Sequence, residues 1–159
     1  MPQPFVNVQP YAPGDGFILA CNLREQDRAE LDAAGHRNHH AAVMESVRRS
    51  QWVRTARIDG RVACVFGLSQ GGTVLSPYGV PWMLGTPLVA QHRRALARLA
   101  PRYIRGMLRQ YPTLRNLVHA RNTIAVQWLQ HVGFRLHRNA FEHPDTGQPF
   151  HLFEMTADV

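Results

Sequence analysis

The segment Asn122-Thr-Ile-Ala-Val-Gln-Trp-Leu-Gln-His-Val-Gly-Phe134 combines a helix start, an apolar helical face and a helix end. Asn122 can cap a helix with its side-chain oxygen, and Gly133 supplies the conformation that ends one. The residues of the apolar face lie between them: Ile124, Ala125, Trp128, Leu129 and Val132. Residues 114–120, directly before, are expected to form a strand. This part of the chain therefore predicts a strand, a capped helix and a return toward the sheet.

A long helix is expected before that strand, over residues 88–110. Its apolar stripe has helical spacing and consists of Leu96, Leu99, Tyr103 and Met107. Pro101 lacks an N–H group, so we expect it to kink or divide the helix. A connection of this length allows two parallel neighbours, and it predicts that the strands ending near Thr86 and Ala120 run parallel.

The middle of the chain predicts a run of antiparallel strands. Residues 52–58 and 61–69 flank Asp59-Gly60, a dipeptide that favours the positive φ angles of a tight hairpin turn. Residues 62–66 are all apolar, which is typical of a central strand covered on both faces. We expect the next turn at Gln70-Gly71-Gly72 and a fourth strand over residues 80–86.

Both ends of the chain add to this pattern. A first strand is predicted over residues 5–11, and a final hairpin pairs residues 134–141 with 150–155. Three short helices follow the first strand. Their expected starts are a cap at Asp15, a capping-box-like pair at Asp27 and Glu30 with an end at Gly35, and a cap at Asn38. Residues 1–159 are therefore interpreted as one α/β domain.

Composition limits the environment of the protein. No stretch approaches the roughly 20 apolar residues that span a bilayer, and the first residues do not resemble a signal peptide, so we expect no membrane partner. Cys21 and Cys64 each lie in an apolar run. They are expected to be two buried thiols rather than a disulfide, which fits a reducing cytoplasm.

The charges are unevenly distributed. All 18 Lys+Arg positions are arginine, and the formal net charge is +7. No acid lies between Asp59 and Glu142, whereas eleven arginines do. Such a region favours an anionic partner, namely nucleic acid, an acidic protein or a phosphorylated cofactor, although solubility alone is the alternative. Specific nucleic-acid binding is the weakest of these because basic residues do not alternate with aromatic ones in any recognised motif.

The segment that begins at Asn122 is similar to the Asn-x-x-Ala...Gly-Phe signature of the GNAT N-acyltransferases, which move an acyl group from coenzyme A to an amine. Residues 22–31, 81–86 and 114–118, with Trp128-Leu129, resemble a GNAT-like family of short-tailed bacteriophages that includes an internal virion protein. The resemblance implies an α/β (α+β) GNAT fold. Its mixed central sheet would have six or seven strands, with a splayed fourth and fifth strand and flanking helices.

The resemblance also implies a cofactor, acetyl-CoA or CoA. Its pantetheine arm would pair with the edge of the fourth strand, and its pyrophosphate would bind at the start of the following helix. The corresponding residues here are Leu84, Gly85, Thr86, Gln91, His92, Arg93 and Arg94, with Asn122 beside the cofactor.

Two candidate catalytic residues follow. His119 ends a predicted strand and is a candidate general base or a structural histidine. Glu45 would face the acceptor cleft or, alternatively, solvent. A metal site is not expected because His36, His39 and His40 lack a cysteine or carboxylate at a suitable spacing.

The sequence departs from the family pattern in two places. In the pyrophosphate loop, Arg94 and Leu96 replace the usual small residues, and Leu129 replaces a tyrosine proposed as general acid. Besides nucleic-acid binding through the basic region, which is the weakest candidate, two functions therefore stay open. One is an acyl-CoA-dependent N-acetyltransferase that acts on a host protein or metabolite. The other is a catalytically degenerate module that binds a bacterial host protein or a virion component, in the host cytoplasm or the virion. A homodimer is left open as well.

Overall fold

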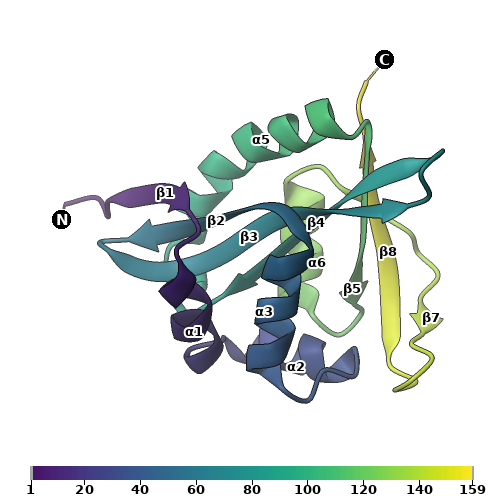
Figure 1. Cartoon of the computed structure of the whole chain (residues 1–159), viewed down its shortest axis with the longest axis horizontal. Helices are drawn as coiled ribbons and strands as arrows, with labels where there is room; N and C mark the ends of the chain where they lie inside the picture. Colours follow the sequence, from purple (N-terminus) through teal and green to yellow (C-terminus); the bar gives the residue numbers. More distant parts are fainter. Residues whose placement is uncertain (1, 159) are drawn as a thin grey trace.

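The computed structural model describes residues 2–158, in which one mixed sheet has the strand order β1-β2-β3-β4-β5-β8-β6, with β7 also pairing with β8 (Figure 1). The strands are β1 (Val6–Pro10), β2 (Ser50–Ile58), β3 (Arg61–Gly72), β4 (Pro77–Gly85), β5 (Thr113–His119), β6 (Arg135–Leu136), β7 (Phe141–Glu142) and β8 (Pro149–Thr156). The predicted fold class is confirmed. The strands number eight rather than six or seven because the final hairpin contributes two very short ones, β6 and β7.

Helices cover both faces of the sheet. They are α1 (Pro13–Cys21), α2 (Glu25–Ala33), α3 (His39–Arg49), α4 (Leu88–Gln91), α5 (Arg93–Gln110) and α6 (Thr123–His131). Helices α1, α2 and α3 share a core cluster with β2, β3 and β4 that includes Leu19, Val43 and Val65. Helices α5 and α6 pack on a second set of apolar side chains that includes Met107, Leu114 and Phe153. A third core cluster joins α4 and the start of α5 to β2 and β3 and includes Ile58 and Leu88. Apolar cores therefore lie on both faces of the sheet.

The β2–β3 hairpin has the predicted turn. Asp59 and Gly60 adopt φ angles of 49° and 80°, as a tight turn of this kind requires. The predicted turn at residues 70–72 is wrong, since β3 continues through Gly72 and the chain turns between Thr73 and Ser76, which exchange main-chain hydrogen bonds. Strand β4 accordingly begins at Pro77, earlier than expected.

Strands β4 and β5 run parallel, as predicted, and they share a single ladder position, Gly79 opposite Leu114. A Cβ atom on Gly79 would lie 2.8 Å from Leu114 Cδ2, so glycine permits this close approach. Beyond that position the two strands diverge (Figure 1). The sheet is thus split at its centre, toward the carboxyl ends of both strands.

The long helix is divided at His92 and not at Pro101. His92 has φ −126° and ψ 26°, outside the helical region, and it separates the short α4 from α5. Pro101 lies inside α5, where its missing N–H removes one hydrogen bond. Leu96 and Met107, on either side of Pro101, are both buried, and this packing holds α5 on the sheet.

The N-cap of α1 is Ala12, so the prediction of a cap at Asp15 is wrong, and Asp15 takes another role. It lies in the first turn, is 3 % exposed and accepts hydrogen bonds from Ala12 N–H, the Thr55 hydroxyl and the Arg57 guanidinium. Burial alone would raise the pKa of Asp15, but the hydrogen bonds and the charge of Arg57 outweigh it and lower the pKa. The carboxylate thus joins α1 to β2.

Two further expectations concern the cysteines and the membrane. Cys64 is buried, and burial raises the pKa of its thiol to about 12. Cys21 is exposed at the end of α1, so the expectation that both thiols are buried is wrong for this residue. Among the helices of residues 2–158, none combines the length and the apolar composition that crossing a bilayer requires.

We expect Asp15→Ala to lower the free energy of unfolding by about 3 kcal/mol at neutral pH, because it leaves a buried hydroxyl and the Arg57 guanidinium without their acceptor. Since the folded-state pKa of Asp15 is lowered, its stabilisation is full above the ordinary aspartate pKa and is lost as the pH falls through the lowered value. Urea denaturation at several pH values measures both effects. The control, Glu25→Ala on the exposed face of α2, should change stability by less than about 0.5 kcal/mol.

Candidate functional site

Helix α2 connects the carboxyl ends of the two splayed strands. At β4, the Asp27 carboxylate accepts the N–H of Gly85 at 2.7 Å and the Arg24 Nε–H at 2.8 Å. The main-chain N–H of Arg24 donates to the carbonyl of Gly85 at 2.9 Å. Both main-chain groups of the last β4 residue are therefore held by the start of α2.

At β5, the contact is made by Glu30. Its carboxylate accepts the main-chain N–H of His119 and the side-chain amide of Asn122, each at 2.8 Å. Burial raises the pKa of Glu30 and Asp27 adds to this effect, while the two hydrogen bonds and Arg24 oppose it. The predicted capping-box role of Asp27 and Glu30 is wrong, because these side chains point to the sheet rather than to the start of their own helix.

The open edge of β4 faces the splay between the strands. Gly85 directs its N–H and C=O away from β3, and alternate residues of a paired strand share that direction, so Pro81 and Met83 do the same. The Pro81 carbonyl accepts the side-chain amide of Asn116 at 2.8 Å. Among residues 2–158 no hydrogen bond is made to the main chain of Met83 on this side. Met83 thus carries the open N–H and C=O pair of the splay.

The predicted cofactor residues of β4 are placed differently. Leu84 directs its main chain to β3, and Gly85 is held by α2. The hydroxyl of Thr86 donates to the carbonyls of Val62 and Ala63. Leu84, Gly85 and Thr86 therefore line the region that the sequence indicated, but their polar groups are used by the fold.

The structure brings the remaining predicted cofactor residues together. Gln91, His92, Arg93 and Arg94 line an open hollow of about 480 Å³, with Arg98 and the N-terminal residues Gln3 and Pro4. The first N–H groups of α5, from Arg93 to Ala95, have no hydrogen-bond acceptor within residues 2–158. A helix does begin at Leu88, as expected, but it is the short α4, and the helix whose first N–H groups face the hollow is α5. Unpaired donors and arginine side chains make this hollow suitable for a phosphate group.

Asn122 caps α6, as predicted, with its Oδ1 accepting the N–H of Ala125 at 3.2 Å. Its Nδ2 is committed to Glu30. His119 is 7 % exposed, and its ring lies 3.3 Å from the Gln148 side chain and against Phe150. Both residues therefore lie at the splay, at the end of β5.

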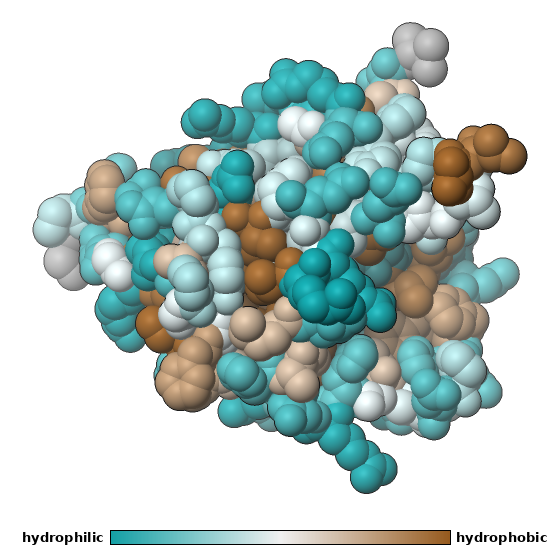
Figure 2. Space-filling view, viewed as in Figure 1, coloured by the Kyte–Doolittle hydropathy of each residue, from teal (hydrophilic) through white to brown (hydrophobic). Residues whose placement is uncertain are grey.

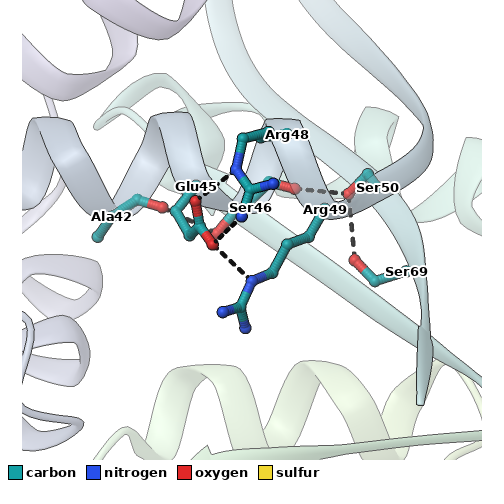
Figure 3. A network of polar contacts seen from close by, with 7 residues as sticks. All are labelled: Ala42, Glu45, Ser46, Arg48, Arg49, Ser50 and Ser69. Carbon is teal, nitrogen blue, oxygen red and sulfur yellow. Dashed lines mark hydrogen bonds and ion pairs between the residues drawn. The ribbon is translucent and has the colours of Figure 1, made fainter.

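Glu45 lies elsewhere, on the exposed side of α3 (Figure 3). Its carboxylate accepts hydrogen bonds from Arg48 and Arg49, which lower its pKa to about 2. No hydrogen bond joins Glu45 to His119 or Glu30 within the described chain. The structure does not bring the two predicted catalytic residues together.

Four residues at the splay were not identified from the sequence: Arg24, Asp27, Glu30 and Met83. The three on or beside α2 have i, i+3 spacing, so the pattern places them on one helix face, but it does not say what that face contacts. The residue type of Met83 does not mark it as a site residue in the sequence, because the groups that matter are its main-chain N–H and C=O. The described residues hold no group of three or more His, Cys, Asp or Glu side chains that could bind a metal ion.

Comparison of the sequence with models of protein families found no match, and comparison with curated proteins found none either. Solved structures do match in fold. An aminoglycoside N(6')-acetyltransferase from Legionella pneumophila is 9 % identical with a TM-score of 0.69, covering 98 % of this chain and 94 % of that one. A GCN5-related N-acetyltransferase from Kribbella flavida is 15 % identical with a TM-score of 0.68, covering 95 % and 97 %. A GNAT-family acetyltransferase from Bacillus anthracis is 7 % identical with a TM-score of 0.68, covering 95 % and 94 %. The fold of this chain is that of the GNAT acetyltransferases.

We expect Asn122→Asp to lower the free energy of unfolding by about 2 kcal/mol at alkaline pH, although aspartate caps helices as well as asparagine does. The change removes the amide that donates to Glu30 and sets two carboxylates side by side, which raises the pKa of at least one. A carboxyl with a raised folded-state pKa binds its proton more readily in the folded chain, so stability should recover as the pH falls through that value.

The matched control for this substitution is Asn38→Asp. Asn38 caps α3 by accepting the Ala41 N–H at 3.0 Å, and it is exposed. Thermal unfolding of this variant should differ from that of the wild type by less than about 0.5 kcal/mol in free energy at all pH values. A similar loss in both variants would show that capping alone, and not the bond to Glu30, matters at Asn122.

Proposed function

We propose that this protein is an acyl-CoA-dependent N-acyltransferase. The observation that carries the proposal is the open N–H and C=O pair of Met83 in the splay, together with the arginine-lined hollow at the start of α5. Two chemical properties of coenzyme A support the proposal. Its pantetheine arm carries amide groups that can pair with the edge of one strand, and its pyrophosphate can accept hydrogen bonds from free N–H groups and guanidinium side chains. Acetyl-CoA or CoA is the proposed cofactor.

The residues of the site fit the phosphate end of that cofactor. Arg94 occupies the position where the family pattern has glycine, so close main-chain approach is restricted there. Arg93 and Arg94 are both exposed, and within residues 2–158 neither forms an ion pair. Their guanidinium groups can therefore donate two hydrogen bonds each to phosphate oxygens.

The bound cofactor would supply an activated acyl group, and the protein must position the amine and accept its proton. In that reaction the acyl group would pass from sulfur to the amine nitrogen, CoA would leave as its thiolate, and the amine proton would need an acceptor among the residues of the protein. His119 and Glu30 are the titratable groups at the end of β5, and burial raises the pKa of the Glu30 carboxyl above its ordinary value, so it takes up a proton more readily than an exposed glutamate does. We assign proton acceptance to this pair in place of Glu45.

A second candidate function is a binding module without catalysis. The contacts of Asp27 and Glu30 favour it, because these carboxylates occupy three donors at the mouth of the splay: Gly85 N–H, His119 N–H and the Asn122 amide. Leu129 cannot donate a proton to a leaving thiolate. On the sequence resemblance alone, such a module would belong to the phage-encoded branch and would bind a host protein or a virion component.

Calorimetry with acetyl-CoA, CoA and desulfo-CoA tests the phosphate site. Arg93→Ala/Arg94→Ala should weaken CoA binding by about tenfold or more, since two charge-assisted contacts are lost. Arg105→Ala/Arg109→Ala removes the same charge farther along α5 and should change affinity much less. Binding without turnover would favour the module, and a wild-type protein that binds none of the three ligands would refute the acyltransferase.

The strand edge has its own test. Met83→Pro removes the open N–H without removing a ladder bond, since Pro81 is already accommodated on the same edge. We expect CoA affinity to fall about tenfold relative to Met83→Ala, which loses the same side chain but keeps the N–H. Circular dichroism and thermal unfolding should show both variants folded. Equal affinities in the two variants would contradict pairing of the cofactor at Met83.

A further inference from the structure

Helix α5 carries a straight row of arginines on its outer side. The row consists of Arg94, Arg98, Arg102, Arg105 and Arg109, all exposed. Their steps of four, four, three and four residues follow the helical repeat, so they lie within an arc of about 80° and extend over about 22 Å. We call these five residues the arginine row.

The arginine row is not neutralised by the protein. The ion pairs among residues 2–158 involve arginines of other elements, and none includes a member of the row. No acid occurs in the sequence between Asp59 and Glu142, so no carboxylate lies on α5 or its flanking segments. Figure 2 shows hydrophilic residues over the helix along the upper edge of the molecule.

The opposite side of α5 fixes the direction of the row. Leu96 and Met107 are buried against the sheet, and Tyr103 packs edge to face on Phe66 with ring centroids 5.0 Å apart. The helix therefore cannot turn its arginines inward. They form a rigid, linear array of positive charge, which fits a partner whose negative charges are themselves arranged along a line.

We propose that the arginine row binds the phosphate backbone of double-stranded nucleic acid without sequence specificity. A duplex carries one negative charge per roughly 1.7 Å of its axis, and guanidinium groups bind phosphates through paired hydrogen bonds. The row would lie along the backbone. It does not enter a groove to read bases, because half of the helix surface is packed on the sheet. This inference does not rest on the proposed acyltransferase activity, although Arg94 and Arg98 also line the hollow proposed for the cofactor.

Other anionic partners fit the row less well. A membrane-bound amphipathic helix inserts apolar side chains into the lipid, but the large apolar side chains exposed within residues 2–158 all lie outside α5. Single-stranded nucleic acid is bound with aromatic side chains that stack on bases, and the only aromatic residue of α5, Tyr103, is half-buried against Phe66. An acidic polypeptide is flexible and would lose more conformational freedom on this straight row than a rigid duplex does.

One end of the row overlaps the hollow proposed for the cofactor. Arg94 and Arg98 line that hollow, whereas Arg102, Arg105 and Arg109 do not. The distal three residues therefore test the row without touching the cofactor site. Arg102→Gln/Arg105→Gln/Arg109→Gln keeps hydrogen-bonding side chains and removes three charges. Arg28→Gln/Arg37→Gln/Arg61→Gln, at exposed positions on other elements, removes the same charge.

The experiment is fluorescence anisotropy of labelled DNA and RNA duplexes of about 20 base pairs at several salt concentrations. Five phosphate contacts predict that wild-type affinity falls about 500-fold between about 50 and 200 mM salt, against about 12-fold for the distal variant with two contacts left. The Arg28, Arg37 and Arg61 control should keep the wild-type salt dependence. Binding to one duplex type or to both identifies which nucleic acid is the source of the phosphates, and either result supports the proposal.

Three outcomes would overturn the proposal. The first is no duplex binding at low salt. The second is an equal loss of duplex affinity in the distal and control variants, which would mean that the duplex responds to the overall positive charge of the protein and not to the arginine row. The third is tighter binding of a single strand, an anionic vesicle or polyglutamate than of either duplex. CoA affinity is measured on the same proteins. Because the distal variant keeps Arg93 and Arg94, a failure of duplex binding and a failure of the proposed acyltransferase site can be told apart.

Discussion

The fold depends on how the gap between β4 and β5 is bridged. These neighbours share one ladder position, at Gly79 and Leu114, so most of the hydrogen bonds that normally join adjacent strands are missing. Asp27 and Glu30 of α2 supply replacements by accepting main-chain N–H groups at the ends of the two strands. A single helix thereby holds both halves of the sheet, and the position of α2 is tied to the width of the splay.

The same donors are needed by the fold and by any ligand in the splay. The N–H groups of Gly85 and His119 and the amide of Asn122 all point to this region, and each already has a carboxylate acceptor. A ligand that approached them would have to displace a charged partner, so pairing is more favourable at Met83, whose main-chain groups are open. The arrangement leaves the inner part of the splay open to a ligand and the outer part to α2. The two donors to Glu30 offset part of the cost of burying its charge, and the remaining desolvation keeps its pKa raised.

Local patterns in the sequence were sufficient for most of the elements. The Asp59-Gly60 turn, the caps at Asn38 and Asn122 and the parallel crossover depend on neighbouring residues or on chain length, and each is found as predicted. The contacts of three buried or partly buried carboxylates could not be predicted in this way. Caps and capping boxes are recognised from neighbouring positions in the sequence, so Asp15, Asp27 and Glu30 were interpreted as local caps. Their partners at Thr55, Gly85 and His119 are 40, 58 and 89 residues away, and no local rule indicates a contact at such separations. The break at His92 was missed for a related reason, since nothing in its residue type marks it.

The placement of the acids also explains why the positive charge gathers on α5. Asp15 and Asp27 pair with Arg57 and Arg24, Glu45 with Arg48 and Arg49, and Glu154 with Arg115, Arg135 and His137. Each of these acids neutralises basic side chains on elements other than α5, so the net charge of +7 is concentrated along that helix. The amino end of α5 adds the partial positive charge of its dipole and opens into the hollow lined by Arg93 and Arg94. An anion attracted to any part of the helix would therefore meet the strongest and most directed donors at that end. The charge distribution thus follows from how the carboxylates are used to hold the sheet together.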